Sequence, residues 1–135
     1  MEFVAPYQLT ILMLGLTGFL FWCQLLIADI TGIRAKHTPG FSVEQDHERF
    51  LFRANRAIAN SNESVGVLIL ASAFAMLSSA NAAVLNGFAC AYFAARVGHM
   101  LSYYANLKIL RSVIFAVSFV SLLGMFVTGL LAWMG

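Results

Sequence analysis

The segment SVGVLILASAFAMLSSANAAVLNGFACAYFAA, residues 64–95, contains no charged side chain. A helix needs roughly 20 apolar residues to cross about 30 Å of hydrocarbon, so a charge-free run of this length predicts two membrane spans. Its one polar cluster consists of Ser78, Ser79 and Asn81. Serine and asparagine favour turns and can cap a following helix. We therefore expect a tight turn here, with Asn81 or Ser79 as the helix cap.

The segments on either side are also free of charge, from Phe3 to Ala28 and from Ser112 to Gly135. The whole chain of 135 residues is 61% hydrophobic and 10% charged, which lies outside the range of soluble globular proteins. We predict an all-α integral membrane protein, a single domain over residues 1–135 that forms a bundle of four transmembrane helices. The expected helices lie near residues 6–33, 46–77, 82–105 and 110–133.

Most basic residues lie in, or run into, the segments that join the first helix to the second and the third to the fourth. They are Arg34, Lys36, Arg49, Arg53, Arg56, Lys108 and Arg111. By the positive-inside rule, these two loops face the cytoplasm and both termini lie on the opposite side. The net charge of +2 is too small to indicate nucleic-acid binding, and we expect no metal site.

A polar stripe follows one face of the second predicted helix. Arg53, Arg56, Asn60 and Glu63 are separated by three or four residues, which places them on the same side of a helix. Roughly 20 residues counted back from Ser78 put the membrane boundary near residue 58. Glu63 therefore lies inside the membrane.

The third predicted helix carries a matching stripe at Arg96, His99 and Tyr103. The same counting places Arg96 about 8 Å inside the boundary, at a depth similar to that of Glu63. An ionised side chain in the middle of a spanning helix costs about 2.5 to 3.5 kcal/mol, so such groups are normally paired. We therefore predict an ion pair between Glu63 and Arg96.

The cations near this boundary outnumber the carboxylates available to them. Basic residues at the ends of spans often extend to lipid phosphates, which suffices to explain Arg49, Lys36 and Lys108. One intramembrane carboxylate cannot balance the remaining arginines, so the surplus positive charge predicts an anionic ligand. The remaining arginines are Arg53, Arg56, Arg96 and Arg111.

Two sequence blocks resemble one known family. The run RANRAIANSNE at residues 53–63 contains an Arg-Ala pair followed by Asn60 and then Glu63, and the second block is ARVGH at residues 95–99, followed by Tyr103 and by Arg-Ser at residues 111–112. This pattern resembles the membrane-associated proteins in eicosanoid and glutathione metabolism, the MAPEG family, and its microsomal glutathione transferases in particular.

The resemblance implies a homotrimer of four-helix subunits with glutathione held between neighbours near the cytoplasmic face. It further implies a membrane-bound, glutathione-dependent transferase or peroxidase that acts on lipophilic electrophiles or lipid hydroperoxides. The expected partners are glutathione as co-substrate, a lipophilic small molecule and membrane lipid.

The resemblance also assigns roles to residues. Arg111 matches the catalytic arginine that faces the glutathione sulfur, where a guanidinium favours the nucleophilic thiolate. Arg96 matches the buried partner of Glu63. The glutathione-binding positions are Arg34, Arg53, Arg56, Asn60, Glu63, His99 and Tyr103.

Two departures from the family pattern concern the substrate and the reach of Arg111. Ala59 stands where prostaglandin-synthase-like members carry a further arginine, and the spacing from Tyr103 to Arg111 differs by one residue among relatives. Two other readings stay open. One is a noncatalytic lipid-binding scaffold of the same family, and the other is a small ion or proton pathway around Glu63, Arg96 and His99.

Overall fold

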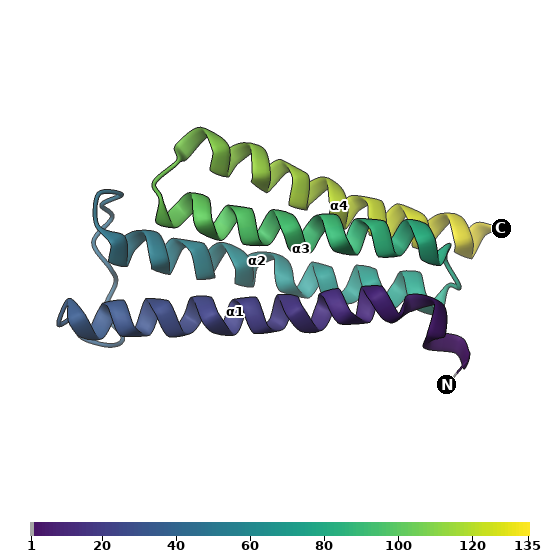
Figure 1. Ribbon diagram of the computed structural model, residues 1–135, viewed down its shortest axis with the longest axis horizontal. Coiled ribbons are helices and arrows are strands. Elements are labelled where there is room, and N and C mark those ends of the chain that lie inside the picture. The colour runs from purple at the N-terminus through teal and green to yellow at the C-terminus, as the bar shows by residue number, and fades with distance from the viewer. Residues whose placement is uncertain (1) are drawn as a thin grey trace.

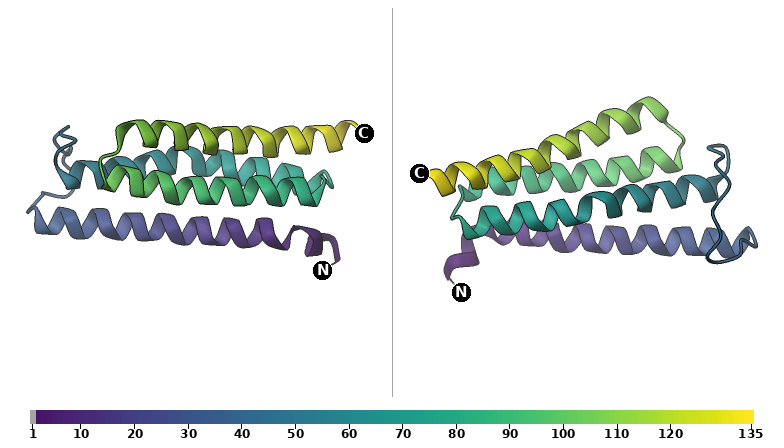
Figure 2. Two further views of the ribbon diagram at one scale, coloured as in Figure 1. Left: turned by 45° about the horizontal axis from the view of Figure 1, so that its top comes forward. Right: turned by 180° about the vertical axis from the view of Figure 1, so that it is seen from behind.

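Four long helices lie side by side and alternate in direction in the computed structural model, which describes residues 2–135 (Figure 1). A short 3-10 helix, η1 (Glu2–Tyr7), precedes α1 (Gln8–Arg34), α2 (Phe50–Leu77), α3 (Ala82–Tyr104) and α4 (Lys108–Met134). No strand occurs among the described residues, so the all-helical prediction is confirmed. The α1–α2 and α3–α4 loops lie at one end of the bundle, and both termini lie at the other (Figures 1 and 2).

The start of α2 differs most from the sequence-based prediction. The helix begins at Phe50 rather than near residue 46. Local polar contacts hold the preceding residues in a loop: the Asp46 carboxylate accepts from the Glu48 N–H at 2.9 Å, and Arg49 contacts Glu44 at 2.6 Å. Such side-chain contacts compete with helical hydrogen bonds.

The predicted turn between α2 and α3 is confirmed, and Asn81 is the N-cap of α3. The Asn81 side chain accepts from the Val84 N–H at 3.1 Å. At Ser79 the backbone adopts a left-handed conformation (φ 55°), and the Ala80 N–H then donates to the Ala75 carbonyl at 3.0 Å. This is the Schellman geometry, which satisfies carbonyls at the end of a helix and stops it sharply.

Three helices are long and apolar enough to span a membrane, namely α1 together with the end of η1, α2 and α4. Large apolar side chains such as Phe19, Trp22 and Trp133 are exposed on the outside of the bundle, as expected for lipid-facing surfaces. The chain is a membrane protein. α3 is not among the three candidates, because polar residues interrupt its apolar sequence.

Asn86, near the start of α3, hydrogen-bonds to η1 and α1. The Asn86 amide donates to the Pro6 carbonyl at 3.1 Å and accepts from the Thr10 backbone N–H at 3.0 Å and hydroxyl at 2.7 Å. Tyr7 donates to the Ala80 carbonyl at 2.7 Å, next to the start of α3. These contacts fasten η1 and α1 to the N-terminal end of α3.

The core is built largely from small residues, which let the helices approach closely. One apolar cluster, around Leu68, Leu85 and Met125, fills the end of the bundle that holds the termini, and a smaller one, around Phe21 and Ile58, lies nearer the α1–α2 loop. α4 diverges from α2 toward its own N-terminal end (Figure 1).

Candidate functional site

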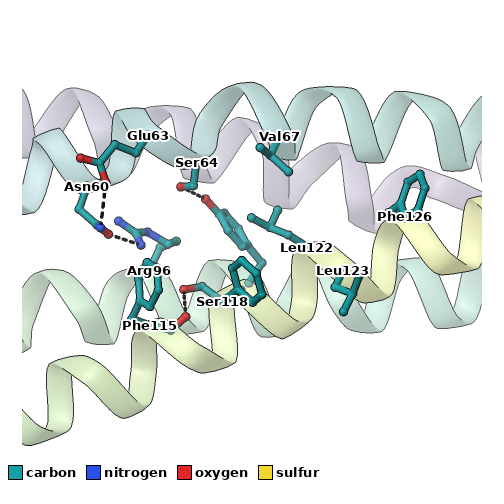
Figure 3. A pocket seen from close by; sticks show the side chains of 12 residues that line it. Asn60, Glu63, Ser64, Val67, Arg96, Phe115, Ser118, Leu122, Leu123 and Phe126 are labelled. Atoms are coloured by element: carbon teal, nitrogen blue, oxygen red, sulfur yellow. Dashed lines mark hydrogen bonds between the residues drawn. The ribbon is translucent and has the colours of Figure 1, made fainter.

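A cavity of about 400 Å³ lies between α2, α3 and α4. Figure 3 shows Asn60, Glu63 and Arg96 together at one end and apolar side chains toward the other. The apolar lining residues are Val67, Phe115, Phe119, Leu122, Leu123 and Phe126. A polar group of donors thus adjoins a space suited to a lipophilic molecule.

Arg96 is the centre of the polar end and has no exposed surface. Its Nη1 donates to the Asn60 side-chain oxygen at 3.0 Å, and its Nη2 donates to the Ser61 hydroxyl at 2.8 Å. Nε has no partner among the described residues. A buried guanidinium is tolerated only where hydrogen bonds replace its hydration, and here α2 supplies two of them.

The predicted ion pair between Glu63 and Arg96 is not formed directly. The Asn60 amide lies between the two charges: its oxygen accepts from Arg96, and its nitrogen donates to the Glu63 carboxylate at 3.4 Å. The physical reason is the rotation of α2, which turns Ser61 into the bundle and leaves Glu63 exposed on the bundle surface. An arginine has only donors, so it also determines that the Asn60 nitrogen faces Glu63.

A second cluster forms where α3 ends and α4 begins. The Arg111 guanidinium carbon lies 4.4 Å from the centroid of the Tyr103 ring, in a cation–π contact. The ring of buried His99 lies 5.0 Å from that of Tyr103, one helical turn along α3. The His99 Nδ1 atom is buried and has no partner among the described residues. The short turn between α3 and α4 reverses the chain and thereby places Arg111 over the Tyr103 ring.

Of the other predicted binding residues, Arg53 and Arg34 lie apart from these two clusters, whereas Arg56 borders the first. Arg53 donates to the carbonyls of His47 at 2.6 Å and Glu48 at 2.8 Å, so it closes the loop before α2. Arg34 is exposed in the last turn of α1. Arg56 is half-buried, one turn before Asn60 on α2.

The sequence model of the MAPEG family matches residues 11–131, nearly the whole chain. The chain belongs to the MAPEG family. This confirms the resemblance read from the two sequence blocks. Members of this membrane family include glutathione transferases and peroxidases as well as other proteins. No curated protein and no solved structure matches the chain.

The sequence analysis did not identify four polar residues that form hydrogen bonds inside this MAPEG protein. The Ser61 hydroxyl donates to the Gln24 side-chain oxygen at 2.7 Å, which links α1 to the Arg96 network. The Ser64 hydroxyl lies 2.8 Å from the Tyr92 hydroxyl, inside the cavity. Tyr92 precedes Arg96 by one helical turn, so the same spacing rule that found His99 and Tyr103 could have found it.

Proposed function

We propose that this protein is a membrane-bound glutathione-dependent transferase or peroxidase that acts on lipophilic substrates. The observation that carries this proposal is the cavity itself, in which a buried arginine, an amide and a carboxylate adjoin an apolar space between three helices. Such a site can hold a charged peptide at one end and admit a lipophile from the bilayer at the other.

The donor set suits glutathione, which carries two carboxylates and one ammonium group. The guanidinium of Arg56 and the amide of Asn60 are suited to a carboxylate, and the exposed Glu63 carboxylate is suited to the ammonium. Arg96 orients Asn60 with its nitrogen toward Glu63, which accepts one of the two amide hydrogens, and the other can be donated to an anion. Arg34, Arg53, His99 and Tyr103 stay predicted binding residues. Tyr103 adjoins Arg111, whereas Arg53 is occupied by loop carbonyls.

Arg111 is proposed as the residue that favours the glutathione thiolate. A thiol with a pKa near 8.5 is mostly protonated at neutral pH, and a nearby guanidinium, which does not deprotonate, stabilises the thiolate. The face of the Tyr103 ring restricts the orientation of the Arg111 guanidinium. A restrained cation loses less conformational entropy when the anion forms beside it.

We expect all four helices to span the membrane, with the two basic loops in the cytoplasm. α3 has 23 residues, which at 1.5 Å per residue gives about 34 Å, enough to cross the hydrocarbon. Asn86 and Arg96 hydrogen-bond to other helices, so these two polar side chains need not meet lipid. Both termini lie at one end of the bundle, as an even number of spans requires (Figure 1).

A noncatalytic lipid-binding scaffold is the second candidate. The mainly apolar lining of the cavity favours it, because such a lining binds a lipid without any thiol chemistry. The two functions differ in turnover, since only the enzyme converts a substrate.

The deciding experiment measures glutathione binding and turnover with the detergent-purified protein. We expect millimolar glutathione to raise the melting temperature, because the site holds more cationic than anionic groups. Conjugation to a generic aryl halide, or reduction of a hydroperoxide, then separates enzyme from scaffold. Absence of both the thermal shift and turnover would refute the proposed function.

A further inference from the structure

Two hydroxyl groups lie between the polar and apolar ends of the cavity, and neither of the two clusters described above gives them a role. Tyr92 and Ser64 both line it, and their oxygens are 2.8 Å apart. Figure 3 shows Ser64 next to Asn60 and Glu63 on one side and Val67 on the other. Building on the proposed function, we propose that this hydroxyl pair selects lipophilic substrates that carry a hydrogen-donating oxygen, namely alkyl hydroperoxides and the corresponding alcohols.

The direction of the hydrogen bonds supports this specificity. A serine hydroxyl has one hydrogen, and that of Ser64 is directed to the Ser61 carbonyl at 3.1 Å. Either oxygen of the Ser64–Tyr92 pair could be the donor, but both Ser64 contacts form together only when the Tyr92 hydroxyl donates to Ser64. Its own oxygen keeps a free lone pair and no free hydrogen, so it is an acceptor for a ligand. An O–H group fulfils this requirement, whereas a ketone, an ether or an alkyl halide does not.

The surroundings make this single acceptor effective. Tyr92 is 1% exposed, so water competes little for its oxygen. The remaining cavity wall beyond it is apolar, apart from Ser118. The Ser118 hydroxyl donates to the carbonyl of Phe115 at 2.8 Å in its own helix, as serines in apolar helices commonly do. A hydrocarbon chain can thus occupy the apolar end while its oxygen meets Tyr92.

Such a substrate is chemically consistent with a glutathione site. The thiolate attacks the terminal oxygen of the hydroperoxide, the O–O bond breaks, and the departing alkoxide takes up a proton to give the alcohol. A second glutathione thiol displaces the hydroxyl of the resulting sulfenic acid as water and forms glutathione disulfide. Tyr92 takes part only by binding the substrate O–H group.

The test compares probes of equal chain length without glutathione. Thermal stabilisation of the purified protein by dodecanol and by chlorododecane is measured at equal mole fractions in the detergent. One uncharged hydrogen bond corresponds to about a fivefold preference for dodecanol. Tyr92→Phe should abolish this preference. Tyr7→Phe is the matched control, because it removes a buried tyrosine hydroxyl that donates to Ala80 outside the cavity.

Ser64→Ala provides a second, independent test. It deprives the Tyr92 hydroxyl of its acceptor and frees that hydrogen for a ligand, so binding of a methyl ketone of the same length should strengthen about fivefold. Ser72→Ala, which removes a buried α2 hydroxyl outside the cavity, should leave ketone binding unchanged. A dodecanol preference that survives Tyr92→Phe, or unchanged ketone binding in Ser64→Ala, would overturn the inference.

Turnover separates this inference from the proposed function. If the wild type processes dodecyl hydroperoxide and dodecyl iodide, Tyr92→Phe should lower kcat/KM for the hydroperoxide alone. If it processes neither, the proposed enzyme function fails, while the dodecanol preference still decides the role of the hydroxyl pair. An equal loss with both substrates in Tyr92→Phe would contradict the selective role.

Discussion

At the scale of single residues, the buried positive charge of Arg96 is held by neutral side chains. Asn60 and Ser61 accept its hydrogen bonds, and Glu63 is linked to it only through the Asn60 amide. Removing a neutral acceptor leaves a buried charged donor unsatisfied, which commonly costs more than the bond itself contributes. The stability of the fold should therefore depend more on Asn60 than on Glu63.

Asn60→Leu should lower the free energy of unfolding by about 2 kcal/mol or more, because it leaves Arg96 Nη1 without an acceptor. Glu63→Gln should lower it by much less and should mainly weaken glutathione binding. Denaturant-induced unfolding of both variants in detergent provides the comparison. If Glu63→Gln proves the more destabilising, the two charges must pair directly in the assembled protein.

Arg111→Ala should lower turnover by at least about tenfold and leave glutathione affinity nearly intact, because the guanidinium is expected to face the sulfur. The ultraviolet absorbance of the bound thiolate should titrate at a higher pH in the variant than in the wild type. Lys108→Ala is the control, since it removes an exposed cation one turn earlier on α4. Loss of binding with unchanged thiol acidity would make Arg111 an anchor for a carboxylate.

At the scale of helices, glycines set how closely α4 approaches its neighbours. A Cβ at Gly129 would lie 2.9 Å from the Cα of Ala75 on α2, and one at Gly124 would meet the Phe88 ring on α3. The first contact is with backbone, which cannot move aside as a flexible side chain can. α4 lies close to α2 at Gly129 and diverges from it toward the α3–α4 loop (Figure 1). The α4 residues that line the cavity all precede Gly129, so they lie on the diverging part.

Gly129→Ala should therefore destabilise the protein by about 1 to 3 kcal/mol, because overpacking must push α4 away from α2. Gly15→Ala is the matched control, since a Cβ there meets nothing within 4 Å and alanine favours the helix. Thermal unfolding of the two variants measures the difference. Equal melting temperatures would show that the α2–α4 contact adapts without cost.

At the scale of the whole molecule, the exposed carboxylate of Glu63 requires an explanation. Glu63 lies near the middle of α2, and with the membrane boundary near residue 58 it is about 8 Å inside the membrane at 1.5 Å per residue. A carboxylate exposed to lipid at that depth is costly, so protein or ligand is expected to cover it. A neighbouring copy of the chain is the covering that the family resemblance implies.

Native mass spectrometry of the detergent-purified protein should show a trimer, and glutathione should increase the trimeric fraction because it would bind across the interface. Glu63→Gln should change this dependence on glutathione. A stable monomer that binds glutathione with undiminished affinity would remove the site between subunits from the proposal.

The sequence by itself determined the four helices to within a few residues, the α2–α3 turn, a cap at either Asn81 or Ser79, and the location of most basic residues near the α1–α2 and α3–α4 loops. These features depend on local quantities: the length of a charge-free run, the spacing of polar residues and the chemistry of a cap. The two blocks around Arg56 and Arg96 also sufficed to recognise the family, as the match to residues 11–131 confirmed.

Only the tertiary structure decided which side chains meet. Periodicity put Asn60 and Glu63 on one stripe, but the rotation of α2 directed Ser61 inward and left Glu63 exposed, so Arg96 contacts Asn60 and Ser61 instead. The contact of Gln24 with Ser61 joins residues 37 positions apart, which no local pattern encodes. A partner across two helices depends on their rotation and separation, and packing of the whole bundle sets both.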